Sequence, residues 1–354
     1  MHLEGTILVG EAFEPVDGRV VVADGEIVRI EEVPVESDDV ILPAFVNAHT
    51  HIGDSVAKEA GEGLSLDELV APPDGLKHRL LRAASHGEKV AAMARTLRYM
   101  ESTGTGTFLE FREGGVDGVA ALRDAVAGTG VDFEARAIDP IVLGRDDPDL
   151  LAVADGYGAS GARDADFDAV RTETREAGKL FGIHAGERDA DDITPAMDLN
   201  PDFLVHMVHA EPGHLDRLAD RGTPVVVCPR SNLVTNVGLP PIRELAERTT
   251  VALGTDNVML DSPSMFREME FAAKLADLPA RDVLRMATVN GAEIAGLNRG
   301  VIEPGADADL LVLDGDSDNL TGAHDLVRAV VRRAGAADVS QVVLGGIEVA
   351  SSGD

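Results

Sequence analysis

The sequence predicts an α/β protein, a (β/α)8 TIM-like barrel with a small β-sandwich domain built from both ends of the chain. Two observations support this fold class. The middle of the chain alternates apolar strands with amphipathic helical stretches, and these strands number eight. Both ends of the chain carry short strands and turn signals instead. We therefore expect the barrel over 44–299 and the β-sandwich domain over 1–43 and 300–354.

The expected barrel strands are short runs of β-branched and aliphatic residues. They lie near 44–49, 106–111, 131–138, 152–157, 180–184, 202–206, 224–228 and 250–255. Between strands, the segment 86–101 has apolar residues at helical spacing, and Gly178 is typical of a helix end. The alternative is an open doubly wound sheet, which predicts a Gly-x-Gly-x-x-Gly loop after the first strand. No such loop follows that strand.

The two chain ends are expected to pair into the β-sandwich domain. Its strands are expected at 6–9, 19–22, 26–30, 308–313, 327–332 and 341–344. The sequence Asp24-Gly25 predicts a tight turn that joins two of these strands into a hairpin. A different kind of segment follows the first barrel strand, because 52–85 is the least regular stretch. An insertion there is expected to lie over the mouth of the barrel, as a lid or an interface.

Charge limits the partners that this protein can have. The formal net charge is −32, with 63 acidic and 31 basic residues, and only five of the basic residues are lysines. A surface dense in carboxylates repels nucleic acid backbones and anionic membranes. Because the acidic residues are spread along the whole chain, they do not resemble the clustered charge of a nucleic-acid mimic. They are typical of a halophilic protein in a high-salt cytoplasm, where ions screen self-repulsion.

Three further features favour a cytoplasmic protein. Cys228 is the single cysteine, so no disulfide forms within the chain. The first residues lack the basic and apolar regions of a signal peptide. No stretch approaches the roughly 18 apolar residues that cross a membrane. We expect a small-molecule partner and no membrane partner, and the sequence leaves a homo-oligomer open.

Candidate metal ligands stand at the ends of four expected strands. His49 and His51 end the first strand, where alternation points both imidazoles to one face. The fifth strand ends in His184, the sixth in His206 and the eighth in Asp256. One such histidine is more often structural, but strand ends meet at one face of a barrel, which favours a shared site. Imidazoles with a carboxylate suit a divalent transition metal.

The same motifs resemble those of the amidohydrolase superfamily, in its branch of cytosine, guanine and adenosine-type deaminases and chlorohydrolases. The resemblance rests on Pro43 to His51, His184 to Glu187, His206 to His209, Pro229 to Leu233 and Leu253 to Asp256. It covers nearly the whole chain and is more specific for the superfamily than for a substrate. It implies one divalent cation, zinc or else iron, that is bound by His49, His51, His184 and Asp256.

The resemblance also implies catalytic roles. Asp256 takes a proton from the water that the cation activates. Glu187 carries a proton to a ring nitrogen of the substrate and then to the leaving group, with a structural role as its alternative. His206 contacts the developing tetrahedral oxygen. Relatives with two metals use a lysine at the end of the fourth strand, and 153–160 contains none. This favours a one-metal site.

Other polar residues near strand ends are candidates for substrate contacts. Glu110 and Arg112 end the second strand, Arg136 lies near the end of the third, and Arg230 follows the seventh. Each has a structural alternative, in an ion-pair network under the loops or, for Arg230, at the surface. The basic residues 77–79 are candidate anion contacts if the insertion folds over the mouth.

These features predict a metal-dependent aminohydrolase. It attacks an amidine-like carbon of a purine, pyrimidine or related heterocycle and releases ammonia. One alternative keeps hydrolysis but changes the bond, to a cyclic amide or to another leaving group such as halide. A non-enzymatic alternative is a degenerate barrel that acts as a binding protein. The complete ligand set together with Glu187 argues against that second alternative.

Overall fold

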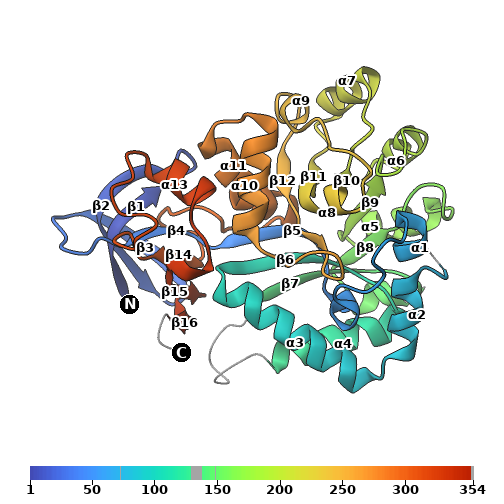
Figure 1. Cartoon of the computed structure of the whole chain (residues 1–354), viewed down its shortest axis with the longest axis horizontal. Coiled ribbons are helices and arrows are strands. Elements are labelled where there is room, and N and C mark those ends of the chain that lie inside the picture. The colour runs from blue at the N-terminus through green and yellow to red at the C-terminus, as the bar shows by residue number, and fades with distance from the viewer. Residues whose placement is uncertain (72, 129–137, 148, 352–354) are drawn as a thin grey trace.

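The predicted barrel is present in the computed structural model, which describes residues 1–71, 73–128, 138–147 and 149–351. A nine-stranded sheet curls round in the order β12-β11-β10-β9-β8-β7-β6-β5-β13, with helices outside it (Figure 1). The strands are β5 (Phe45–His51), β6 (Thr105–Arg112), β7 (Asp139–Gly144), β8 (Gly156–Ala159), β9 (Leu180–Ala185), β10 (Phe203–His206), β11 (Val225–Val227), β12 (Val251–Leu253) and β13 (Asp256–Asn257).

Two short strands share the eighth position and close the barrel. β12 pairs in parallel with β11, and β13 pairs in parallel with β5. Between them, the Asn47 side chain donates to Thr255 Oγ1 at 2.7 Å and accepts from the Thr255 N–H at 3.0 Å. Gly254 is required beside them, because a Cβ there would lie 2.7 Å from His49 Cβ. The barrel therefore closes directly against His49.

The third and fourth strands begin later than the sequence predicts. The third strand was expected at 131–138, of which 131–137 lie outside the described residues, and the structure has β7 at Asp139–Gly144. The fourth begins at Gly156 instead of 152, after the 3-10 helix η2 (Leu150–Ala152). Leu150 and Ala154 are buried in the core. The apolar residues that predicted a strand from 152 therefore belong partly to a turn that packs against the core.

Helices cover the outside of the barrel, and local sequence explains their ends. α3 (His86–Ser102) begins with a capping box between Ser85 and Glu88. α7 (Pro212–Arg221) has proline in its first turn and ends at Gly222, whose φ is 65°. The other helices of the barrel are α4 (Gly115–Ala127), α5 (Asp168–Glu176), α6 (Ile193–Asp198), α8 (Pro229–Val234), α9 (Ile242–Ala246), α10 (Met265–Ala276), α11 (Ala280–Ala287) and α12 (Val289–Ala295).

Apolar side chains fill the barrel interior below the mouth. The rings of Phe111 and Phe203 lie 6.0 Å apart, and the ring of His49 packs edge-on against Phe111 at 4.6 Å. Gly182 makes room for them, since a Cβ there would lie 2.4 Å from the Phe203 ring. The barrel is therefore a packed core, and polar chemistry is confined to its mouth.

Both chain ends form one further sheet of seven strands, in the order β16-β15-β14-β4-β1-β2-β3. These are β1 (His2–Val9), β2 (Glu14–Ala23), β3 (Glu26–Glu32), β4 (Val40–Pro43), β14 (Leu310–Leu313), β15 (Val339–Leu344) and β16 (Ile347–Ser351). Antiparallel pairing of β14 with β4 joins the two ends. The hairpin predicted at Asp24-Gly25 is confirmed by the pairing of β2 with β3.

The prediction of a strand over 327–332 is wrong, because this segment is helix α13 (Leu326–Arg332). Asp325 caps the helix by accepting a hydrogen bond from the Arg328 N–H at 2.9 Å. Val327, Val330 and Val331 are buried, at a spacing that fits one face of a helix as well as a strand. α13 packs against α10 and α11, and these contacts bury its apolar face.

The insertion 52–85, which we call the cap, lies over the mouth of the barrel as expected. It contains the 3-10 helix η1 (Ile52–Ala57), α1 (Leu66–Val70) and α2 (Leu76–Ala83). Figure 1 shows α1 and α2 on the side of the barrel away from the terminal sheet. Asp67, Lys77 and His78 of the cap line the cavity at the mouth. Every helix in the described part of the chain is too short or too polar to cross a membrane.

Candidate metal centre

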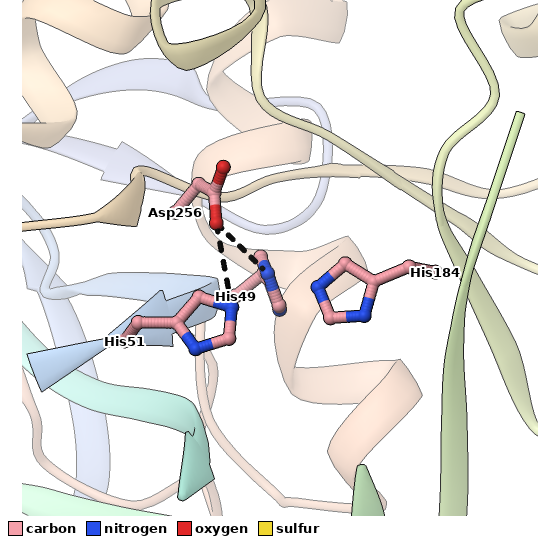
Figure 2. Close-up of side chains that lie close together, drawn as sticks. All are labelled: His49, His51, His184 and Asp256. Atoms are coloured by element: carbon pink, nitrogen blue, oxygen red, sulfur yellow. Dashed lines mark ion pairs between the residues drawn. The ribbon is translucent and has the colours of Figure 1, made fainter. Parts of the chain in front are cut away.

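Three histidines and one aspartate meet at the mouth of the barrel (Figure 2). His49 and His51 come from β5, His184 from β9 and Asp256 from β13, and one ligand atom of each lies within 4.8 Å of the others. Asp256 Oδ1 is 3.2 Å from His49 Nε2 and 3.5 Å from His51 Nε2. The structure therefore brings together the four residues that the sequence analysis selected as ligands.

The donor set fits a divalent cation. His49 is fully buried, and neither of its ring nitrogens makes a well-formed hydrogen bond within the described residues, although Nε2 is 3.2 Å from Asp256. A buried polar atom without such a partner is unfavourable, and a shared cation would satisfy it. His184 Nδ1 lies 2.8 Å from the Ala159 carbonyl oxygen. Donation to that carbonyl leaves the Nε2 lone pair free for the metal.

Electrostatics keeps the ligands in their metal-binding forms. Burial, with the nearby charge of Lys77, lowers the pKa of His51 to about 3. Burial also lowers the pKa of His49 and of His184. Burial raises the pKa of Asp256, but the close contact with His49 Nε2 and the nearby imidazoles outweigh burial and hold that pKa well below its usual range. Neutral imidazoles and an ionised carboxylate bind a divalent cation.

Acid–base residues lie directly beside the ligands. Glu187, His206 and Asp256 also have ligand atoms within 4.8 Å of one another. Glu187 Oε2 is 3.7 Å from His206 Nε2, and burial raises the pKa of the Glu187 carboxyl. Two residues of α8 hold this group: Asn232 Nδ2 is 3.1 Å from His206 Nδ1, and Ser231 Oγ donates to Asp256 Oδ2 at 2.5 Å.

The backbone of this group is strained. His206 has a φ of 78° and Asp256 a φ of 57°, both in the left-handed region that side chains rarely adopt. Each of these residues lies at an end of a short barrel strand, β10 or β13. Such strain is typical of residues whose position is dictated by a site rather than by local preference.

These residues open into one cavity of about 310 Å³, a size that suits a small heterocycle. His51, His184, Glu187, His206 and Asp256 line its inner end. Four cationic side chains also line it, although the chain as a whole is strongly acidic. They are Lys77, Arg145, Arg163 and Arg188.

Two of the predicted substrate contacts, Glu110 and Arg112, make hydrogen bonds within the protein at the second strand. Glu110 is fully buried and accepts hydrogen bonds from the Ile52 N–H at 2.7 Å and from Thr50 Oγ1 at 2.8 Å. Arg112 pairs with Glu110 at 3.1 Å and with Glu113 at 3.3 Å. Neither side chain lines the cavity. Their hydrogen bonds fit the ion-pair network that the sequence left as the alternative.

Arg230 is also away from the cavity. Its guanidinium lies 3.3 Å from Glu268 and 2.5 Å from Asp261, and its side chain is 6% exposed. These two acidic residues bury the guanidinium, which corrects the surface position suggested for Arg230. The substrate contact stays a prediction, and Arg230 does not line the cavity. Arg136 lies outside the described residues.

Two polar residues at the site were not selected from the sequence. Glu113 directly follows β6, and Arg145 directly follows β7. Their position after a strand is the signal that identified the metal ligands. Burial raises the pKa of Glu113, but the charges of Lys77 and Arg145 hold it well below its usual range. Glu113 is therefore an ionised carboxylate in contact with His51.

Comparison with known proteins agrees with this geometry. Residues 40–349 match the amidohydrolase family. A putative aminohydrolase of Methanothermobacter thermautotrophicus is 35% identical over 347 residues, which cover 88% of this chain and 90% of that protein. The 5-methylthioadenosine/S-adenosylhomocysteine deaminase of Halobacterium salinarum is 28% identical over 399 residues, which cover 98% and 89%.

The fold agrees as well. A crystal structure of an adenosine deaminase from Xanthomonas campestris with bound zinc has a TM-score of 0.79 at 20% identity. The match covers 98% of this chain and 92% of that one. At this identity the likeness concerns the fold alone. The family match, in contrast, spans most of the sequence and includes every residue of the metal group, and so this chain belongs to the amidohydrolase family.

Proposed function

We propose that this protein is a metal-dependent aminohydrolase. It removes an amino group as ammonia from an amidine-like carbon of a purine, pyrimidine or related heterocycle. The main support for the proposal is that three of the four candidate ligands, His51, His184 and Asp256, line one cavity with Glu187 and His206. The fourth, His49, has a ligand atom within 4.8 Å of those of the other three. Membership of the family, and relatives named as aminohydrolases and deaminases, support the same reaction class.

The metal would be one divalent cation bound by His49, His51, His184 and Asp256, and we favour zinc, which the adenosine deaminase structure holds. When bound, such a cation supplies Lewis-acid chemistry that activates a water for attack on carbon. Ser231 Oγ donates to Oδ2 of Asp256, which leaves Oδ1 turned to the imidazoles. Asp256 would also take the proton that the water gives up.

Glu187 and His206 would complete the proton transfers. A buried carboxyl with a raised pKa retains a proton closer to neutral pH, so Glu187 can give its proton to a ring nitrogen. Asp256, whose carboxylate is within 4.8 Å of Glu187, would then pass on the proton taken from the reacting water, and Glu187 would give it to the departing amine. His206 Nδ1 contacts Asn232, and therefore Nε2 is the nitrogen that faces Glu187 and the cavity. From there it can donate to the oxygen that forms on the attacked carbon.

The test is metal analysis coupled to an ammonia-release screen of amino-heterocycles in molar salt. We expect one metal per chain and ammonia from at least one heterocycle, with activity lost to a chelator and restored by zinc. Opening of cyclic amides or release of halide without ammonia would favour the alternative hydrolase. A protein that neither binds metal nor turns over any of these compounds would favour the binding protein.

We also propose that the protein works in a high-salt cytoplasm. The net charge of −32 supports this, because like charges on a compact chain repel one another. Salt screens that repulsion, with a Debye length of about 10 Å at 0.1 M and about 3 Å at 1 M. We expect the melting temperature to rise between these two concentrations of KCl. A melting temperature that is unchanged or lower would contradict the proposal.

A further inference from the structure

A buried carboxylate connects the cap to the metal ligand His51. Glu113 Oε1 lies 2.8 Å from Lys77 Nζ, 2.9 Å from Arg145 Nη2 and 3.3 Å from His51 Nδ1. The exposed fraction of its side chain is 7%. Lys77 comes from α2 of the cap, while Arg145 follows β7. One oxygen therefore contacts the cap, the end of the third barrel strand and the end of the first.

Two groups near His51 Nδ1 favour opposite tautomers of the ring, and the nearer of the two is Glu113, at 3.3 Å. Arg145 Nη2 is also near Nδ1, at 3.5 Å, but a guanidinium only donates hydrogen bonds and cannot accept the N–H of Nδ1. Glu113, when ionised, only accepts them. With the proton on Nδ1 and shared with Glu113, the lone pair of Nε2 is directed towards Asp256 and the other ligands.

A simpler role for Glu113 is that of a counter-ion for Lys77. Lys77, which is 4% exposed, already has a second carboxylate, because Asp54 Oδ2 lies 3.1 Å from its Nζ. Glu113 also pairs with Arg112 at 3.3 Å through its other oxygen. Charge balance alone does not require a Glu113 oxygen within reach of His51 Nδ1. The observed geometry therefore calls for a role at the histidine as well.

We propose that Glu113 is a positioning residue of the metal centre. It holds His51 in the tautomer and orientation that present Nε2 to the cation, and through Lys77 it links this orientation to the position of the cap. The proposal rests on the metal site of the proposed function. Carboxylates behind metal-binding histidines typically change metal affinity by about 10–100-fold.

The test uses metal binding rather than activity. Apo-protein is titrated with Zn²⁺ against a chromophoric chelator, and Co²⁺ absorbance reports the ligand geometry. In Glu113→Gln, the amide can turn its NH₂ group towards His51 Nδ1 and favour the opposite tautomer. We expect zinc binding about 10–100-fold weaker than wild type and a changed Co²⁺ spectrum.

A matched control is Glu101→Gln. Glu101 is also a buried glutamate, 8% exposed, but it lies near the end of α3, before β6 begins, and does not line the cavity. The same chemical change at this position should leave zinc affinity and the Co²⁺ spectrum at their wild-type values. Equal weakening of zinc binding in the control would mean that general destabilisation causes the effect, and would overturn the proposal.

A double variant separates the positioning role from the counter-ion role. Lys77→Met combined with Glu113→Gln removes both charges. If Glu113→Gln alone does not fold, zinc binding is measured on this double variant instead. Positioning predicts that zinc binding stays weak, because His51 Nδ1 still lacks the carboxylate even though the charge of Lys77 has been removed as well. Recovery of zinc affinity to within about threefold of wild type would overturn the proposal, while leaving the proposed function intact. Wild-type protein that binds no zinc would overturn both.

Discussion

Replacement of Glu187 tests the proposed chemistry most directly. Its carboxyl is 3.7 Å from His206 Nε2, but it does not belong to the group of His49, His51, His184 and Asp256 that would bind the cation. Glu187→Gln keeps the shape of the side chain and removes its transferable proton. We therefore expect normal metal content and a large loss of turnover.

The size of the loss follows from the number of proton transfers. A positioned acid or base typically contributes about 10²–10⁴-fold to the rate. Because Glu187 would serve both the ring nitrogen and the leaving group, we expect kcat to fall by about 10³–10⁴-fold. This corresponds to about 4–5.5 kcal/mol of transition-state stabilisation. KM should change far less, because glutamine still forms hydrogen bonds with the substrate.

The assay measures ammonia release and metal content on the same samples. Near-normal turnover of Glu187→Gln, with one metal per chain, would refute the proton carrier. Loss of the metal together with activity would instead show that Glu187 is a ligand. A useful comparison is Glu101→Gln, a buried glutamate outside the cavity lining, which should retain wild-type turnover.

Three further predictions concern the ligands and the fold. His184→Ala should lower zinc affinity by at least about 100-fold in a chelator competition and abolish ammonia release, because it removes an imidazole that the Ala159 carbonyl orients. Asn47→Ala removes hydrogen bonds of 2.7 and 3.0 Å to Thr255, so urea denaturation should show an unfolding free energy about 2–3 kcal/mol lower. Burial raises the pKa of Glu268 to about 8, above its pKa in the unfolded chain. The protonated Glu268 side chain therefore contributes its full stability below the unfolded pKa, and this contribution is lost as the pH rises through about 8. Wild type should therefore lose stability relative to Glu268→Gln between about pH 5 and pH 9, as measured by urea denaturation at each pH.

The group of candidate metal ligands could be predicted because each lies at the end of a run of strand residues. His184 and Asp256 are distant from His49 in the chain, but the position after an apolar strand is a local property of the sequence. Barrel topology then brings such ends to one face. The hairpin of β2 and β3 in the terminal sheet could be predicted for a similar reason, since it depends on the local turn Asp24-Gly25.

The surroundings of the ligands could not be predicted in this way. The pairing of Lys77 with Glu113 depends on how the cap folds over the mouth, and no local pattern encodes that contact. Arg230 follows a barrel strand as the metal ligands do, but carboxylates on and near α10 hold its side chain away from the cavity. The segment 327–332 has a valine pattern common to helices and strands, and only its packing on α10 and α11 decides between them.

The pairing of β5 with β13, which we call the seam, also affects the order in which the metal site can form during synthesis. Asn47 and Thr255, which join this seam, are 208 positions apart, so His49 and His51 leave the ribosome long before Asp256 exists. Until Asp256 is made, a nascent chain offers the histidines without the aspartate and without a closed barrel to hold them together. We therefore expect metal loading to be a late step of maturation, and protein that escapes it to open first where β13 pairs with β5.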